Sequence, residues 1–159
     1  LNQLEEKVSF LHADVNDVTR FIKPDSVDVI TCNPPYFKLS ESSFTNELDA
    51  FAIARHEIHL TLDQLMKQTS HLLKMKGKAY FVHRPDRLME ILETMRNNRI
   101  APKKLQFIYP KQNKEANMIL IEGIKDGKED GFRVLPPLVV YNEEGEYSQK
   151  VKDVLYGEQ

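Results

Sequence analysis

The 159-residue sequence has few of the residues that disulfide-rich, metal-binding and membrane proteins need. Its single cysteine, Cys32, excludes an internal disulfide and a zinc site built from several cysteines. No apolar run approaches the roughly 18 residues of a membrane-spanning helix, and the first residues have neither the basic nor the apolar part of a signal peptide. We therefore expect a soluble, non-secreted protein, and the cytoplasm is the simplest assignment.

The net charge of −2 hides an uneven distribution of charge along the chain. Residues 55–114 contain 13 of the 22 Lys and Arg residues but only 5 of the 24 Asp and Glu residues, and the rest of the chain is acidic. Counterion release allows a basic stretch of this size to serve as a nucleic-acid footprint. A set of solvated helix faces explains the same charges equally well.

The chain is long enough to enclose one core, since 41% of its residues are apolar and 29% are charged. It does not begin with Met, and residues 1–7 are typical of the end of a helix that leads into a strand. We therefore expect that an amino-terminal segment is missing, and that residues 1–159 are the carboxyl-terminal part of a single domain.

The apolar periodicity predicts alternating strands and helices. The β-prone runs are residues 8–11, 27–31, 78–82, 105–109, 118–121 and 133–140. The helical patterns cover residues 15–22, 47–73 and 86–97, and the second is either one long helix or two consecutive helices. The two runs around residues 111–115 predict an antiparallel hairpin, and Pro136-Pro137 interrupts the last run. This order is typical of an α/β fold with a mixed, mostly parallel sheet that ends in an antiparallel strand.

The run at 27–31 leads into Asn33-Pro34-Pro35-Tyr36, at the carboxyl end of a strand, where open α/β sheets bind ligands. The Asn33 amide oxygen and the Pro34 carbonyl can each accept a hydrogen bond from an exocyclic amine, which turns the nitrogen lone pair toward an electrophile. Pro35 stiffens the turn, and Tyr36 offers a flat face for an extruded base. The alternative is that the prolines simply end a buried strand and Tyr36 belongs to the core.

The tetrapeptide resembles the motif of class I amino-methyltransferases, which methylate adenine N6, guanine N2 or protein glutamine. The segments NPPYFK, ARHEIHLTLD, GKAYFVHRP, KEANMILIEGIKDG and LPPLVVYNEEGEYS resemble the tRNA(Val) adenine-37 N6-methyltransferase family and its Gram-positive relatives over nearly all of the chain. The resemblance implies a Rossmann-like class I methyltransferase fold, S-adenosyl-L-methionine as the methyl donor and tRNA as the substrate. It also implies that Asn33, Pro34, Pro35 and Tyr36 form the catalytic clamp.

The same resemblance places the donor at Asp14, Val15 and Asn33. The Asp14 carboxylate would accept a hydrogen bond from the donor's adenine amine, and Val15 would lie against the ring. Asp14 can equally cap the short helix that follows it. The family's glycine-rich motif and its acidic residue for the ribose are not present, since the first glycine is Gly77. We therefore expect weak donor binding without the missing segment.

Seven residues are candidates for contact with RNA phosphates, because they lie in the basic stretch near the predicted carboxyl edge or the hairpin. They are Arg55, His83, Arg84, Lys103, Lys104, Lys111 and Lys114. Each has a plainer alternative: Arg55 lies on a solvated helix face, His83 and Arg84 belong to a turn closed by Pro85, and the lysines promote solubility.

No cluster of His, Cys, Asp and Glu has metal-ligand spacing, and no Ser or Cys lies in a nucleophile-elbow context, so we expect no metal and no covalent intermediate. These features predict an adenine N6-methyltransferase that acts on tRNA. Guanine N2 in rRNA and protein glutamine remain alternative substrates, because the clamp recognises an NH₂ group. A non-catalytic RNA-binding module is the alternative from another class.

Overall fold

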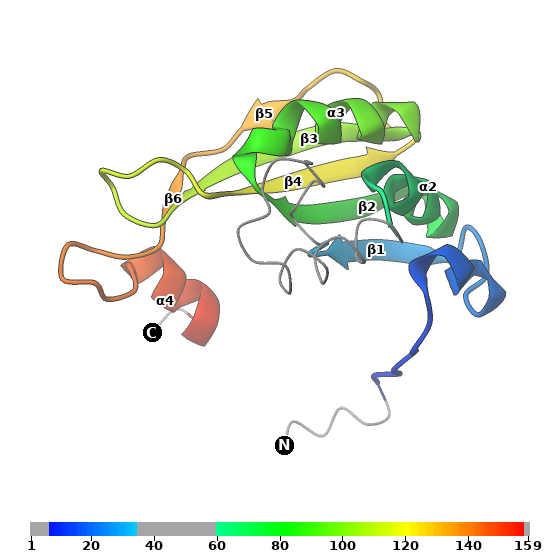
Figure 1. Cartoon of the computed structure of the whole chain (residues 1–159), viewed down its shortest axis with the longest axis horizontal. Coiled ribbons are helices and arrows are strands. Elements are labelled where there is room, and N and C mark those ends of the chain that lie inside the picture. The colour runs from blue at the N-terminus through cyan, green and yellow to red at the C-terminus, as the bar shows by residue number, and fades with distance from the viewer. Residues whose placement is uncertain (1–6, 35–59, 158–159) are drawn as a thin grey trace, which may run out of the picture.

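The computed structural model describes residues 7–34 and 60–157 of the chain (Figure 1). Its helices are η1 (Val15–Arg20), α2 (Leu62–Leu72), η2 (Pro85–Arg87), α3 (Leu88–Asn97) and α4 (Gln149–Tyr156). Its strands are β1 (Val27–Cys32), β2 (Leu73–His83), β3 (Ile100–Tyr109), β4 (Met118–Lys125), β5 (Arg133–Val134) and β6 (Leu138–Val139).

The strands form one six-stranded sheet in the order β1-β2-β4-β3-β5, and β6 also pairs with β3. β1 is parallel to β2, β4 is antiparallel to both β2 and β3, and β5 and β6 are parallel to β3. Only β4 runs against the other described strands, which confirms the expected mixed, mostly parallel sheet. β4 lies inside the sheet, because the hairpin folds it back between β3 and β2, so the expectation that the sheet ends in an antiparallel strand is wrong.

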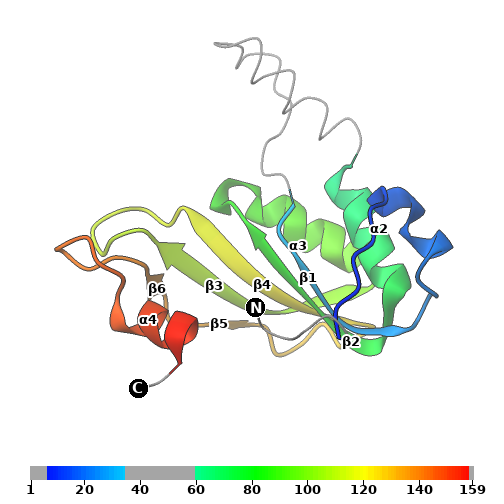
Figure 2. The same ribbon diagram turned by 90° about the horizontal axis from the view of Figure 1, so that it is seen from below.

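Helices α2 and α3 cover one face of this sheet (Figure 2). α2 begins with a capping box, in which Thr61 Oγ1 accepts a hydrogen bond from Gln64 N at 3.2 Å and Gln64 Oε1 accepts one from Thr61 N at 2.8 Å. The helix then buries Leu65 and Met66 in the core. The capping box fixes where the helix begins, and the spacing of the apolar residues sets the face that meets the sheet.

The core lies between these two helices and the sheet. Its fully buried members include Met66, Phe81, Ile91, Met95 and Ile121, all with 1% exposure or less. Along β2 and β4 the core residues alternate with residues on the opposite face, as a pleated strand requires. The face turned toward α2 and α3 therefore carries the apolar core, and the other face carries side chains such as Tyr80 and Glu122.

The strand expected at residues 8–11 is not formed, so this prediction is wrong. Residues 8–13 have no regular structure, and Phe10 is 97% exposed. A β-prone run needs a neighbouring strand for its backbone hydrogen bonds. Among the described residues no strand lies beside β1 on the side away from β2.

The other predicted elements are confirmed with shifted ends. Within the pattern expected at 47–73, helix α2 begins at Leu62, after the cap at Thr61, and ends at Leu72, so one continuous helix over this range is wrong. Residues 47–59 lie outside the described residues. β2 begins earlier than expected, directly at Leu73, but the chain bulges between the pairs Val27–Leu73 and Val29–Lys78. Pro136-Pro137 divides the last expected strand into β5 and β6, because proline cannot donate a ladder hydrogen bond.

The carboxyl-terminal segment adds a small lobe beyond β3. Val140 N donates to Tyr109 O at 2.8 Å, and the chain then makes a tight hairpin in which Tyr141 and Tyr147 form a β-bridge. Helix α4 follows this hairpin, and its residues Val154, Leu155 and Tyr156 are exposed. None of the described helices is long and apolar enough to cross a membrane.

Candidate functional site at the carboxyl edge of the sheet

The register of β1 and β2 places the carboxyl ends of these two strands side by side. Cys32 pairs with Phe81, so the residues that follow β1 lie next to Val82 and His83. His83 pairs with Ile119 of β4, which in turn pairs with Phe107 near the end of β3. The turn after β1, the turn after β2 and the loop between β3 and β4 therefore lie along one edge of the sheet.

Asn33 and Pro34 occupy this edge, as the sequence predicts. Asn33 is exposed and lines a groove of about 660 Å³, whereas Pro34 is buried. The groove continues over Thr31, Tyr80 and Leu120 on the sheet face opposite α2 and α3. A buried proline fixes the backbone from which the Asn33 side chain projects. Pro35 and Tyr36 lie outside the described residues.

His83 lies at the same edge but points into the protein. Its side chain is only 1% exposed, and its Nδ1 accepts a hydrogen bond from Arg84 N at 2.8 Å. Burial, together with the positive charge of Arg87, lowers the pKa of His83 below its ordinary value. A buried, uncharged ring does not contact a phosphate, and the predicted nucleic-acid contact of His83 is corrected accordingly.

Asp14 and Val15 lie at the start of η1. Asp14 Oδ1 accepts a hydrogen bond from Asn16 N at 2.8 Å. One carboxylate oxygen of Asp14 therefore caps η1, as in the alternative interpretation. The carboxylate is exposed, and the second oxygen can still accept a hydrogen bond from an amine. Val15 is half-buried and packs against the core cluster. These residues fit the adenine end of a donor, but the described residues add no glycine-rich turn for the rest of it.

In the described part of the basic stretch, more than half of the cations are paired with carboxylates. Of the twelve Lys and Arg residues described between positions 60 and 114, seven form ion pairs with carboxylates. They are Lys74, Arg84, Arg87, Arg96, Arg99, Lys103 and Lys104. The excess of positive charge in this stretch is therefore largely used to bind acidic residues elsewhere in the chain.

Lys103 and Lys104 are the clearest corrections among the predicted phosphate contacts. Lys103 Nζ donates hydrogen bonds to the carbonyl oxygens of Lys128 and Asp130, and its side chain is only 16% exposed. Lys104 Nζ donates to Glu122 Oε2 at 3.0 Å within the sheet. Both ammonium groups have partners in the fold, which favours a structural role for each lysine over contact with an RNA backbone.

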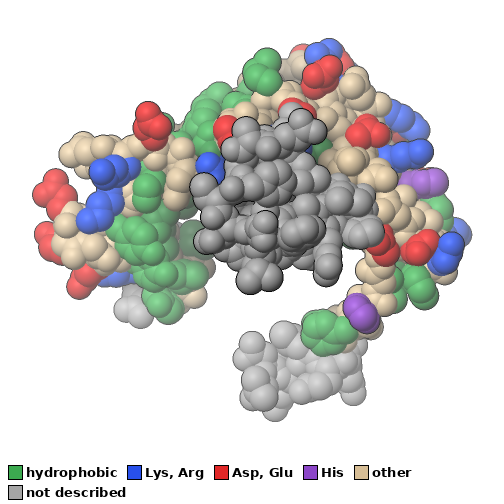
Figure 3. Space-filling view, viewed as in Figure 1, with side chains coloured by type: hydrophobic (Ala, Val, Ile, Leu, Met, Phe, Trp, Pro, Cys, Tyr) green, Lys and Arg blue, Asp and Glu red, His purple; other side chains and the backbone are tan. Residues whose placement is uncertain are grey.

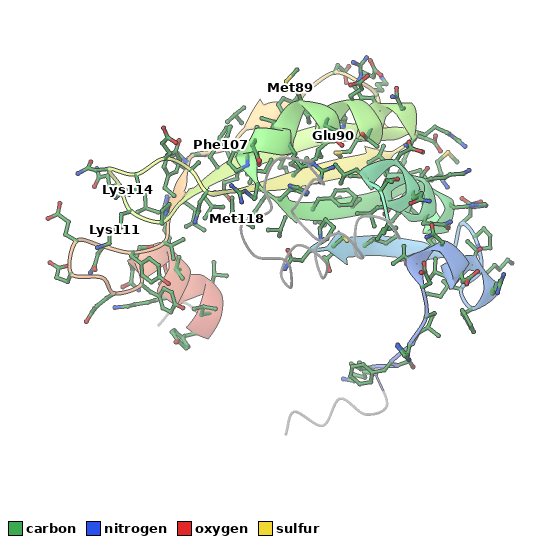
Figure 4. The ribbon with its side chains drawn as sticks, in the orientation of Figure 1. Met89, Glu90, Phe107, Lys111, Lys114 and Met118 are labelled. Carbon is green, nitrogen blue, oxygen red and sulfur yellow. The ribbon has the colours of Figure 1, made fainter. Side chains whose placement is uncertain are left out.

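Three of the predicted cations are exposed and remain candidates for contact with phosphate. Arg84 is exposed at the turn after β2, where its Nε lies 3.6 Å from Asp86 Oδ1. Lys111 and Lys114 both project from the loop between β3 and β4 (Figure 4). Both are exposed, and neither forms an ion pair with another residue in the described part of the chain. Arg55 lies outside the described residues.

Two groups of side chains near this edge are not among the residues predicted from the sequence. Tyr80 and Glu122 form a polar network with Lys104 inside the groove that Asn33 lines. The signal was available, since Tyr80 follows Ala79 and precedes Phe81 and Val82, and Glu122 follows the apolar run 118–121. Tyr141 and Tyr147 stack with their ring centroids 5.3 Å apart. Their signal was an aromatic residue on each side of a glycine-containing turn.

Metal binding has no structural candidate among the described residues, since no group of three or more His, Cys, Asp and Glu side chains comes together there. Cys32 is a free, half-buried thiol, and burial raises its pKa above the ordinary value. The edge therefore offers hydrogen-bond acceptors and cations to a ligand.

Comparison with curated proteins finds several similar sequences with one description. The chain is 31% identical over 112 residues to the tRNA1(Val) (adenine(37)-N6)-methyltransferase of Aliivibrio salmonicida, which covers 70% of this chain and 47% of that protein. It is 28% identical over 93 residues to the protein of the same description from Cytophaga hutchinsonii, covering 58% of this chain and 38% of that protein. The chain thus spans about half the length, or less, of these relatives. It matches no protein-family model.

Solved structures establish the fold. A predicted O-methyltransferase from Agrobacterium tumefaciens superimposes with a TM-score of 0.69 at 19% identity, covering 92% of this chain and 62% of that one. A putative DNA modification methylase from Thermus thermophilus, solved in complex with S-adenosyl-L-methionine, gives a TM-score of 0.52 at 17% identity, covering 89% and 59%. The described part of the chain has the Rossmann-like fold of these methyltransferases, which confirms the fold expected from the sequence.

Proposed function

We propose that this chain is the carboxyl-terminal part of an S-adenosyl-L-methionine-dependent methyltransferase domain that methylates the exocyclic N6 amine of an adenine in tRNA. The observation that carries the proposal is the position of Asn33-Pro34 directly after β1, at the carboxyl edge of a sheet with a methyltransferase fold. The curated relatives are described as tRNA adenine N6-methyltransferases, which supports the choice of substrate. A tRNA substrate agrees with a cytoplasmic location.

The clamp acts by orienting a poor nucleophile. The lone pair of an aromatic amine is delocalised into the ring, so the nitrogen must be turned toward the methyl group. The Asn33 side-chain oxygen and the Pro34 carbonyl would accept the two amine hydrogens, and Tyr36 would stack on the base. A nitrogen held in this way would accept the methyl group that the donor, once bound, would release from its sulfur. The proton then leaves the methylated nitrogen, which is acidic, so no strong base is required.

The donor would be held at the adenine end by Asp14 and Val15. The donor supplies an electrophilic methyl group on a positively charged sulfur. Asp14 retains one carboxylate oxygen beyond its capping hydrogen bond, and Val15 lies at the margin of the core. Asn33 is the residue of this chain that would lie between the donor and the base.

Two alternatives differ from this proposal in substrate or class. Guanine N2 and protein glutamine also present an NH₂ group to the clamp. The exposed cations at the edge, Arg84, Lys111 and Lys114, favour a nucleic acid over a glutamine side chain. A non-catalytic RNA-binding module would use the same cations but would not transfer a methyl group.

The decisive experiment measures tritium transfer from labelled S-adenosyl-L-methionine to unmodified bulk tRNA by the full-length protein, followed by nucleoside analysis. We expect labelled N6-methyladenosine. The Asn33→Ala variant should lose about a hundredfold or more in kcat while donor binding changes little, because its hydrogen bond matters most in the transition state.

Asn97→Ala is the matched control. Asn97 is an exposed asparagine at the end of α3, away from the carboxyl edge, and its variant should behave like the unchanged protein. Label found in guanosine or in protein would show that the substrate is guanine N2 or protein glutamine instead of adenine N6. Donor binding without any transfer to tRNA would reject tRNA, and the absence of donor binding would leave the RNA-binding module.

A further inference from the structure

A second groove lies on the same edge, between the loop that joins β3 to β4 and the carboxyl-terminal lobe. Its volume is about 450 Å³, and one wall consists of the loop residues 111–114. The other wall consists of Val139, Tyr141, Asn142, Glu143 and Ser148. The groove therefore has two lysines and two side-chain amides on one side, and an aromatic ring on the other.

The wall that carries Tyr141 is fixed by a dense set of hydrogen bonds. Tyr141 N donates to Pro110 O at 3.0 Å, and Ser148 N donates to Val140 O at 2.8 Å. Asn142 N donates to Glu146 O at 2.9 Å. The rings of Tyr141 and Tyr147 stack at an interplanar angle of 14°, and they are still 37% and 40% exposed. The aromatic surface is thus held in place and remains accessible to a ligand.

The facing lysines are not used by the fold. Lys111 and Lys114 are exposed and, within the described residues, form no ion pair, in contrast to Lys103 and Lys104. Figure 3 shows Lys and Arg side chains next to a hydrophobic area on this lobe, with acidic side chains at its outer rim. Two unpaired cations beside an aromatic face suit a nucleotide, whose phosphate is anionic and whose base is flat.

We propose that this groove binds a nucleotide of the RNA substrate close to the methylated adenosine, with its phosphate at Lys111 and Lys114 and its base stacked on Tyr141. The inference rests on the proposed function, because it takes the substrate to be RNA. In the strand order β1-β2-β4-β3, three strand spacings, roughly 14 Å, separate β1 from β3, and the groove lies beyond the end of β3. A few nucleotides of RNA would span the two sites. Glu143 repels a phosphate but can accept a hydrogen bond from a base amine, so the base faces the tyrosine side. Proteins read RNA sequence mainly in single-stranded loops, where bases are free to stack.

The test measures binding of a fluorescein-labelled anticodon stem-loop RNA to the full-length protein, together with kcat and KM for methylation of tRNA. Tyr141→Leu removes the flat ring but keeps its bulk, and should raise Kd and KM by about fivefold or more with little change in kcat. Tyr141→Phe keeps the ring and should retain binding. In Lys111→Gln/Lys114→Gln, the slope of log Kd against log salt concentration should become shallower by about 1.4.

The matched controls are Tyr156→Leu on α4 and Lys67→Gln/Lys128→Gln, all at exposed positions outside the groove. These control variants should bind RNA like the unchanged protein. The donor affinity of every variant, controls included, should equal that of the unchanged protein. Unchanged Kd, KM and salt slope in the Tyr141 and lysine variants, with methylation intact, would overturn the groove but not the proposed function. If the unchanged protein transfers no methyl group to RNA, the proposed function fails. Photocrosslinking of 5-bromouridine RNA to Tyr141 would still support the groove, and its absence would reject it.

Discussion

Lys104 and Glu122 are paired residues of β3 and β4, and Lys104 Nζ lies 3.0 Å from Glu122 Oε2 on the sheet face opposite α2 and α3. Burial alone would raise the pKa of Glu122. Hydrogen bonds from Lys104 and from the Tyr80 hydroxyl outweigh it, and the pKa lies below its ordinary value. Burial is the main reason that the pKa of Tyr80 is raised, and the hydrogen bond to Glu122 and the charge of Glu122 raise it further. The glutamate therefore remains charged and organises this polar cluster.

Glu122→Gln should destabilise the protein by about 1–2 kcal/mol, because the Lys104 ammonium loses its charged partner. The loss stays below that of a fully buried pair, since the Lys104 side chain is 33% exposed and water can reach it. Urea unfolding at neutral pH measures the difference. The double variant Lys104→Met/Glu122→Gln is the control, and its cost should be less than the sum of the single costs. Additive costs would show that the pair does not interact.

His83 should make the stability depend on pH. Its pKa is below the ordinary value of 6.5 in the folded chain, so between these two values the unfolded chain binds a proton that the folded chain does not. The free energy of unfolding should therefore fall as the pH is lowered below 6.5, by at most about 1.4 kcal/mol per pH unit.

The measurement compares urea unfolding at pH 7.5 and about pH 5.5 for the unchanged chain and for His83→Asn, whose amide oxygen can still accept the hydrogen bond from Arg84 N. The variant should show the smaller change with pH. Equal pH dependence in the two proteins would mean that the ring takes up a proton in the folded state.

The sequence was sufficient to predict the helices and strands that have a clear apolar pattern and local residues that begin or end them. The apolar run at 118–121 and the break at Pro136-Pro137 are local signals, and the structure confirms the corresponding strands. The cap at Thr61 is also a local signal, but the predicted helical pattern ran through it. The run at 8–11 has the same local signal, but a strand also requires a partner. Whether a partner is present cannot be determined from the run itself.

In the candidate site, too, some residues could be placed from local sequence and others depend on tertiary contacts. The position of Asn33-Pro34 follows from the strand that precedes it, and this part of the site could be predicted. The availability of a lysine depends on which carboxylate the fold brings near it. Lys103 meets the backbone of residues 128–130 and Lys104 meets Glu122, both from distant parts of the sequence. Lys111 and Lys114 differ from them only in tertiary context.

Lys103 should therefore behave as a structural residue. Lys103→Gln removes hydrogen bonds to the carbonyl oxygens of Lys128 and Asp130, at a cost of about 1 kcal/mol, and should make the segment 126–132 more sensitive to proteases. RNA binding should remain within about twofold of the unchanged protein, measured by the same fluorescence assay as Lys111→Gln. A loss of RNA binding as large as that of the Lys111 variant would restore Lys103 as a phosphate contact.

Gly123 of β4 allows α3 to lie close to the sheet. A Cβ atom at this position would clash with Met95 Cε and would lie 2.5 Å from Ile100 Cγ2. The methionine end can move, but the branched Ile100 is fully buried and has little freedom. Gly123→Ala should therefore destabilise the chain by about 1–3 kcal/mol, as measured by urea unfolding. In an Ile100→Ala background the added methyl group has room, so its cost should be smaller there. The same cost in both backgrounds would place the origin of the glycine requirement in the backbone rather than in this contact.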